Sequence, residues 1–262
     1  KKQEYDGYWG YSSSSYYYTE GLSRYTYFGN KYAGVYNEET YALTGDEVYD
    51  PAKGGLAMYY KNVYKTDAQG NVLKDENKAK IVEKVIATTT YSEADQYVGE
   101  DMLAKAFGGF GTGFQYKGFD LSVDFQYQLG GKVYDGEYQT LMGGMAGYGF
   151  HTDVLNAWTP ENSGSNIPRF QASYTGMTSS SDRWLTSASY LTLGNITFGY
   201  TLDKKILKSA HIESARLYFV ADNIYTWSKR KGLDPRQSLT GGSDAMTYSP
   251  IRTFSCGVNI VF

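Results

Sequence analysis

The chain has 262 residues, with 25 Lys and Arg against 28 Asp and Glu, so its formal net charge is −3. This balance gives no electrostatic case for binding nucleic acid. The 28 Tyr and 30 Gly favour pleated strands and frequent turns over helices. One cysteine excludes an internal disulfide, and no apolar run reaches the eighteen residues of a membrane-spanning helix. A search for long apolar runs does not detect a transmembrane β-barrel, because polar and apolar residues alternate along its strands.

The first hundred residues carry the weakest patterns. The stretch 7–36 is rich in tyrosine with little alternation, and TDAQGN (66–71) is typical of a turn. ENKAKIVEKVIA (76–87) fits a short helix and a strand equally well. We expect 37–106 to be mostly loop.

A β-hairpin is predicted next. From Phe119 to Leu129 every second residue is apolar, and the residues between are Asp, Ser or Gln. Phe114 and Tyr116 carry the same alternation just upstream, separated from Phe119 by Lys117-Gly118. Glycine accepts the positive φ that a two-residue hairpin turn requires. The preceding GGFGTG (108–113) lacks the spacing of a phosphate-binding loop and runs into a strand, which argues against nucleotide binding.

Three more strands are predicted towards the C-terminus. In YLTLGNITFGYTL (190–202) the apolar alternation changes phase at Gly194-Asn195, which a β-bulge explains. ARLYFVADNIYTW (215–227) alternates less cleanly, with Asn223 breaking its apolar face. In RTFSCGVNIVF (252–262) every second residue is apolar, namely Phe254, Cys256, Val258, Ile260 and Phe262, and the residues between are small or mostly polar, with Val261 as the apolar exception.

The length of these segments favours a membrane. At about 3.3 Å per residue, eleven residues tilted by about 40° span on the order of 28 Å, enough for the apolar band of an outer-membrane barrel. Short and long connections alternate, as short periplasmic turns and long extracellular loops do in such barrels. The segments 130–189 and 228–251 are then extracellular loops, and a short helix or a turn is expected between Gly143 and Gly149. Aromatic residues gather near both predicted rims.

Catalytic motifs are missing. The two histidines, His151 and His211, lie far apart, and there is no HExxH, no Cys/His cluster and no GxSxG. Half of a calcium loop around Asp67 and Gly70 lacks the other ligands, so a turn suffices. We therefore expect no enzyme activity, no cofactor and no metal.

Polar residues of the predicted strands would line a barrel lumen, either contacting a solute or forming a hydrated wall. These residues are Asp120, Asp124, Gln126, Gln128, Arg216, Asp222 and Asn259. Trp158 and Trp184, taken as exposed in the long loop, could stack on sugar rings or pack the loop on itself, and packing is slightly preferred. The residues expected to contact a substrate or a lid are Trp158, Arg169, Trp184 and Asp222.

Several segments resemble one family. YLTLGNITFGYTL, LYFVADNIYTWSKRKGLDP and RTFSCGVNIVF are similar to the C-terminal signature of the SusC-like (SusC/RagA) TonB-dependent transporters of Bacteroidetes outer membranes. KYAGVYNEET, GGFGTGFQYKGFDLSVDFQYQLGGKVYD and LNAWTPENSGSNIPRF match in the same order. The resemblance runs from about Leu22 to Phe262.

The resemblance implies an all-β fold, a transmembrane antiparallel β-barrel of twenty-two strands with long extracellular loops. It also implies a multi-pass outer-membrane importer of oligosaccharides or oligopeptides with several partners: a SusD-like lipoprotein lid, TonB, and the membrane lipid. No signal sequence, TonB-contacting segment or plug is recognised in the chain. We therefore expect 1–262 to be a C-terminal barrel segment without a plug domain, completed by the plug and the N-terminal strands of the transporter.

Two alternatives remain open. A soluble Tyr-rich carbohydrate-binding module or surface adhesin would stay in buffer without detergent and pack its strands from both faces. A self-contained small barrel, adhesive or enzymatic, needs eight or more strands, whereas the sequence predicts five.

Overall fold

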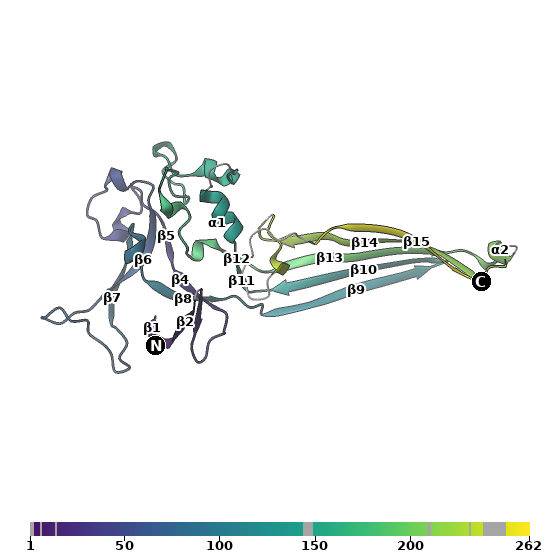
Figure 1. Cartoon of the computed structure of the whole chain (residues 1–262), viewed down its shortest axis with the longest axis horizontal. Coiled ribbons are helices and arrows are strands. Elements are labelled where there is room, and N and C mark those ends of the chain that lie inside the picture. Colours follow the sequence, from purple (N-terminus) through teal and green to yellow (C-terminus); the bar gives the residue numbers. More distant parts are fainter. Residues whose placement is uncertain are drawn as a thin grey trace. The chain divides into compact units, whose positions relative to one another are not determined.

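The computed structural model of the chain describes residues 3–5, 7–13, 15–143, 149–208, 211–230, 232–237 and 250–262. The chain divides into two compact units (Figure 1). We call Lys1–Met102 with Tyr134–Leu185 the loop unit, and Leu103–Val133 with Thr186–Phe262 the sheet unit. No helix in the described ranges is both long and apolar enough to cross a membrane.

The sheet unit is one antiparallel five-stranded sheet of order β15-β14-β13-β10-β9. Its strands are β9 (Ala106–Tyr116), β10 (Phe119–Leu129), β13 (Tyr190–Thr201), β14 (Ser214–Ser228) and β15 (Thr253–Val261). A short helix, α2 (Lys204–Leu207), lies between β13 and β14. All five strands predicted from the alternation are therefore confirmed, with lengths of 9 to 15 residues.

The predicted hairpin turn is also confirmed. Lys117 has a φ of 46° and Gly118 a φ of 88°, so both central residues lie in the left-handed region that such a turn requires. Tyr116 and Phe119 are directly opposite each other, as the alternation indicated.

A bulge runs across the middle of the sheet. The β10–β13 register shifts between Asp124 and Phe125, and the β13–β14 register shifts between Leu193 and Asn195. Gly194 is the extra residue of β13, and Asn223, which interrupts the apolar face of β14, has a φ of 51°. The phase change at Gly194-Asn195 is therefore a bulge, and it keeps the apolar side chains of both strand halves on one face.

The register gives the sheet two faces of different chemistry, because directly opposed residues of antiparallel strands point the same way. The apolar face consists of Phe110, Phe114, Tyr116, Phe119, Leu121, Val123, Phe125, Tyr127, Leu191, Leu193, Ile196, Phe198, Tyr200, Ala215, Leu217, Phe219, Ala221, Tyr225, Trp227, Phe254, Cys256, Val258 and Ile260. Most of its large side chains are exposed. The polar face carries most of the Asp, Gln, Thr and Asn residues of the same strands and Arg216, together with the apolar or aromatic side chains of Phe107, Tyr190, Tyr218 and Val220.

The loop unit contains two further sheets, of order β1-β2-β3-β4-β8 and β5-β6-β7. Its strands are β1 (Gln3–Tyr5), β2 (Tyr8–Ser13), β3 (Tyr16–Tyr18), β4 (Thr26–Asn30), β5 (Tyr32–Val35), β6 (Ala57–Tyr64), β7 (Val82–Thr88) and β8 (Gln96–Asp101). The loop unit also contains the α-helix α1 (Gly136–Gly143). A separate two-stranded sheet pairs β11 (Lys132–Tyr134) with β12 (Leu185–Ser187).

Much of the loop unit is held by short 3-10 helices. They cover Tyr41–Thr44, Pro51–Lys53, Tyr91–Glu93, Thr152–Asn156, Pro160–Asn162, Thr175–Met177 and Asp182–Trp184, and Pro235–Gln237 is a 3-10 helix in the described part of the sheet unit. The segment 37–106, expected to be mostly loop, thus has more regular structure than its pattern indicated. Stretch 76–87 ends in strand β7 rather than in a helix. Asp67 closes the predicted turn, accepting hydrogen bonds from the Gln69 and Asn71 N–H groups.

Two predictions fall mostly outside the described residues. The segment between Gly143 and Gly149 was expected to form a helix or a turn, and 144–148 are not described. The same holds for 238–249, in the long connection that follows β14.

Candidate functional site

An ion pair spans the polar face of the sheet. The Arg216 guanidinium of β14 donates to both carboxylate oxygens of Asp120 on β10, with 3.0 Å between Nε and Oδ1. It crosses β13 above Gly199, where an added Cβ atom would lie 2.5 Å from Arg216 Nη2 and from Asp120 Oδ1. Glycine at this position therefore allows two strands that are not neighbours to be linked through their side chains.

Other polar-face groups also bond across strands. Asn195 Nδ2 donates to Asp222 Oδ1 at 2.7 Å, and the hydroxyls of Thr192 and Thr226 lie 3.0 Å apart. Asp222, predicted as a substrate or lid contact, thus has one oxygen engaged within the sheet. These contacts support the interpretation of this face as a hydrogen-bonded wall, which holds the strand register.

Two of the predicted contact residues meet in the loop unit. Arg169 Nη1 donates to the carbonyl oxygens of Ala52 at 3.1 Å and Gly54 at 3.0 Å. The Trp158 ring lies against Gly55, whose φ of 80° and lack of a side chain allow this contact. A Cβ atom on Gly55 would overlap the ring, so Gly55, Trp158 and Arg169 form one packed cluster.

Buried tyrosines surround this cluster. The Ala57 N–H donates to Tyr174 Oη at 2.6 Å, and the Arg169 guanidinium lies 5.9 Å from the centre of the Tyr174 ring. Burial raises the pKa of both Tyr174 and Tyr59 well above the ordinary value for a phenol. Both hydroxyls therefore stay neutral at physiological pH and contribute hydrogen bonds rather than charge.

Trp184 corrects one expectation. It was taken as exposed, but only 1% of its surface is accessible, and it packs in a core with Met142, Ala157 and Met177. Its Nε1 donates to the Ser179 carbonyl oxygen at 2.8 Å, which satisfies the one polar group of a buried indole. Packing of the loop on itself is therefore the role that the structure gives Trp184.

Among the four predicted contact residues, the structure brings together only Trp158 and Arg169. Asp182 was missed from the sequence, although its Oδ1 accepts a 2.7 Å hydrogen bond from the Tyr32 N–H across 150 positions. No local pattern signals such a distant contact. Among the described residues, no group of three or more His, Cys, Asp or Glu side chains is arranged to hold a metal ion.

Comparisons with known proteins find receptors and transporters that are similar to this chain. No family model matches it. It is 29% identical over 258 residues to the TonB-dependent receptor P3 of Formosa agariphila, a match that covers 93% of this chain and 22% of that receptor. It is 27% identical over 182 residues to the TonB-dependent receptor SusC of Bacteroides thetaiotaomicron, covering 66% of this chain and 17% of SusC. The chain thus spans about a fifth of the length of these relatives.

Solved structures give the same result for the fold. A structure of the RagAB peptide transporter superposes with a TM-score of 0.69 at 24% identity, covering 94% of this chain and 24% of that one. The RagAB peptide importer in its open-open state superposes with a TM-score of 0.71 at 22% identity, covering all of this chain and 25% of that one.

These matches confirm three of the predictions. The chain is related to the SusC-like TonB-dependent transporters, as its motifs indicated. Its fold class is the predicted all-β one, with the antiparallel strands of a transmembrane barrel. The relatives are receptors and transporters rather than enzymes, in agreement with the missing catalytic motifs.

Proposed function

We propose that this chain, a relative of the SusC-like TonB-dependent transporters, forms barrel wall and extracellular loops of an outer-membrane importer for oligosaccharides or oligopeptides. TonB-dependent receptors are outer-membrane proteins, and the sheet unit would cross the membrane several times. The importer would work with a SusD-like surface lipoprotein. Its plug and remaining barrel strands would be those parts of the relatives that this chain does not match.

One observation carries the proposal: the apolar face of the sheet unit. Bulges keep bulky apolar side chains on that face over the whole length of the strands, and most of the large ones are exposed. On the opposite face the Asp120 carboxylate is paired with the Arg216 guanidinium, and Asp222 accepts a hydrogen bond from Asn195. An exposed apolar surface of this extent on a sheet of such length suits contact with acyl chains.

The proposed mechanism needs no covalent chemistry. Cargo would be captured between the loops and the lipoprotein lid, and TonB-driven movement of the plug would then open the lumen. The polar face would form part of the lumen wall. Trp158 and Arg169, whose side chains stay partly exposed, are the better candidates for contact with the lid or cargo, because Trp184 is buried.

The substrate class stays between oligosaccharides and oligopeptides. RagAB is named a peptide importer, and its similarity to this chain supports peptides as one of the two classes. At 22–24% identity this likeness concerns the fold, so it does not decide between them.

Co-purification tests the assembly. Outer membranes carrying a tagged version of the protein are solubilised in detergent, and the polypeptides that elute together are identified by mass spectrometry. We expect a plug-bearing transporter polypeptide and a surface lipoprotein. Recovery of the protein from buffer without detergent, with neither of these, would reject the importer and favour the soluble carbohydrate-binding module or adhesin.

Cys256 gives a direct test of the two faces. It is the single cysteine and lies on the apolar face, opposite Phe219. A spin label on Cys256 in membranes should collide readily with dissolved oxygen and poorly with a water-soluble nickel complex. The matched control is a label at Ser255→Cys in a Cys256→Ser background, where the preference should reverse. Equal accessibility to both reagents at the two positions would contradict the proposed lipid-facing surface.

A further inference from the structure

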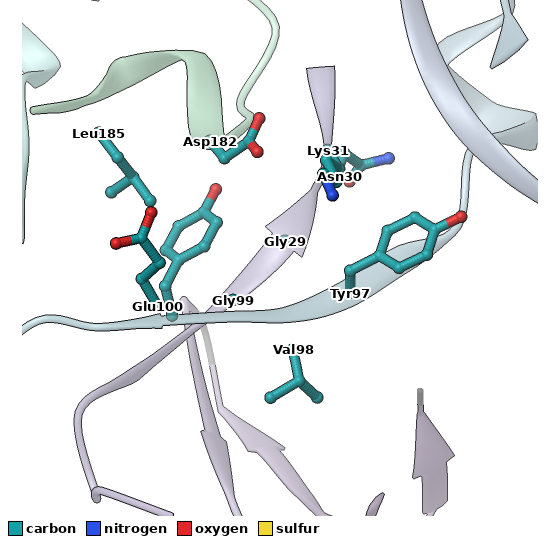
Figure 2. A pocket seen from close by; sticks show the side chains of 10 residues that line it. Gly29, Asn30, Lys31, Tyr97, Val98, Gly99, Glu100, Asp182 and Leu185 are labelled. Atoms are coloured by element: carbon teal, nitrogen blue, oxygen red, sulfur yellow. The ribbon is translucent and has the colours of Figure 1, made fainter. Parts of the chain in front are cut away.

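A pocket of about 290 Å³ lies wholly within the loop unit (Figure 2). Strand β4, strand β8 and the 3-10 helix Asp182–Trp184 supply its walls. Figure 2 shows the Glu100 side chain rising from β8 on the side where Asp182 lies, whereas Val98 points the opposite way. Neither the predicted contact residues nor the polar face of the sheet unit contributes to this pocket.

Asp182 brings a desolvated carboxylate to the pocket. Its Oδ1 accepts the 2.7 Å hydrogen bond from the Tyr32 N–H, and Oδ2 has no hydrogen-bond partner among the described residues. Burial raises the pKa of Asp182 above the ordinary carboxyl value; the Tyr32 N–H hydrogen bond and the charge of Lys31 act against this shift, and the charge of Glu100 adds to it. A cation beside Oδ2 would offset this cost of burying the charge.

Tyr27 brings a second unsatisfied group. Its side chain is only 4% exposed, and its ring lies over Gly29, where an added Cβ atom would be 2.5 Å from Oη. Within the described part of the chain the Tyr27 hydroxyl makes no hydrogen bond, although it lines the pocket. Burial raises the pKa of Tyr27, so its oxygen is a neutral acceptor at physiological pH. The ring of Tyr27 is buried, whereas its hydroxyl opens onto the pocket, where a donor can reach it.

The charges around the pocket disfavour an anion. Glu100 and Asp182 are acidic, and Lys31 is the one basic residue in the lining. The Lys31 ammonium lies 5.5 Å from the centre of the Tyr60 ring, which attracts it. The lining therefore holds more acidic than basic residues, and among its described groups Asp182 Oδ2 and Tyr27 Oη are acceptors that face the pocket.

We propose that this pocket binds a primary ammonium group, which donates hydrogen bonds to Asp182 Oδ2 and Tyr27 Oη beside the negative charge of Glu100. An ammonium has three donors and no acceptor, so it matches a site that offers oxygens. The volume accommodates a small organic cation, such as a peptide N-terminus or an amino sugar. This inference goes beyond the proposed function, because the pocket lies within one unit and its chemistry does not depend on transport.

Saturation-transfer NMR on the detergent-purified protein tests the inference with matched probes. Butylamine reports on the bare ammonium group, glycylglycine on a peptide N-terminus, and glucosamine on an amino sugar. N-acetylated glycylglycine and N-acetylglucosamine keep the shape of their parents but lack the charge. We expect the charged probes to bind and the acetylated ones to bind at least about tenfold more weakly, as loss of a charge-assisted hydrogen bond implies. The tighter of the peptide and sugar amines identifies the source of the group.

Variants locate the binding. Asp182→Asn keeps an acceptor for the Tyr32 N–H but removes the charge, and we expect about a tenfold loss of affinity for butylamine. Tyr27→Phe removes only the hydroxyl, and a smaller loss of about threefold or more is expected. Asp67→Asn is the matched control, because it makes the same substitution at an exposed turn outside the pocket and should leave binding unchanged.

Clear outcomes overturn the proposal. It is wrong if acetylated probes bind as tightly as their amines, if no amine binds, or if Asp182→Asn binds butylamine like the parent protein. Should Asp182→Asn fail to fold, Tyr27→Phe decides in the same way. Binding is measured without TonB or a lipoprotein, so a protein that binds amines but imports nothing would reject the proposed function and leave this inference standing.

Discussion

The buried aromatic core of the loop unit contrasts with the exposed aromatic side chains on the apolar face of the sheet unit. In the sheet unit Phe198 is 45% exposed and Phe219 43%, and both lie on the apolar face. In the loop unit Tyr17 and Tyr36 are fully buried, and Trp184 is nearly so. Aromatic residues are abundant in both, so composition does not set the difference. The apolar face of the sheet unit leaves its rings for an apolar environment to cover, whereas buried rings of the loop unit pack against each other.

The stabilising contacts differ in the same way. In the sheet unit each strand of the order β15-β14-β13-β10-β9 pairs with its neighbour over nearly its full length. The loop unit depends on contacts between distant segments, such as the Tyr32 N–H with Asp182 and Tyr91 Oη with the Ser180 carbonyl oxygen. Regular pairing can be derived from local alternation, but a set of distant contacts cannot.

The largest expected effect concerns buried aromatic packing. Trp184→Ala removes the centre of the core with Met142 and Met177 and should cost about 3–5 kcal/mol of the stability of the loop unit. Pulse proteolysis in detergent, with cleavage sites mapped by mass spectrometry, measures this cost. Trp227→Ala, on the exposed apolar face, is the control and should leave the loop unit unchanged. If the loop unit resists proteolysis equally in the two variants, buried and exposed aromatic residues do not differ in their contribution to its stability.

The second test compares the same substitution on the two faces of one strand. Ile196→Arg places a charge on the apolar face in the middle of β13 and should destabilise the membrane-inserted protein by about 2–4 kcal/mol. Thr197→Arg places the same side chain on the polar face, and its cost should be much smaller. Urea titration of the protein in lipid vesicles compares them. Similar costs for both positions would mean that the sheet is not two-sided in the membrane.

A third test concerns the ion pair over Gly199. Gly199→Ala places a methyl group against Arg216 and Asp120 and should cost about 1–3 kcal/mol in the same titration. Gly194→Ala, where the nearest atom to the new Cβ is the Asp124 carbonyl oxygen at 3.5 Å, is the matched control and should cost less. If Gly199→Ala is neutral, the ion pair does not constrain the strands.

The smallest expected effect is a pH dependence in the loop unit. Burial raises the pKa of Asp182, so the folded unit holds this proton more tightly than the unfolded chain does. The stability from this group is therefore fully present below the unfolded pKa and is lost as pH rises through the folded pKa. Asp182→Asn should flatten that decrease as pH rises above about 4, the ordinary pKa of an Asp carboxyl group. Pulse proteolysis at several pH values measures it, and an unchanged slope would contradict the assignment.

Most of the sheet unit was predictable from local sequence. The alternation around Phe119, the glycine of the Lys117-Gly118 turn and the phase change at Gly194 each have a direct counterpart in the structure. Each signal lies within about a dozen residues and acts through strand geometry. Which glycine lies under which side chain was not predictable, because Gly199 meets Arg216 only after three strands are aligned.

Most of the structure of the loop unit could not be predicted from the sequence. Its 3-10 helices are three to five residues long, too short for a periodic pattern. The burial of Trp184 depends on Met142 and Ala157, which are distant in the chain. The predicted contact of Trp158 and Arg169 with a substrate or a lid stays a proposal. The pocket at Asp182 and Tyr27 was found only in the structure.

Three glycines of β9 leave part of the polar face without side chains of its own along one edge of the sheet. Gly109, Gly111 and Gly113 occupy alternate positions on the polar face, opposite Gln126, Asp124 and Ser122. The Asp124 carboxylate lies over Gly111, whereas an added Cβ atom at Gly113 would have only the Leu121 carbonyl oxygen, at 3.8 Å, as a neighbour. If the polar face forms the lumen wall as proposed, a bulky residue at Gly113 would narrow the lumen beside β9 without disturbing the hairpin turn.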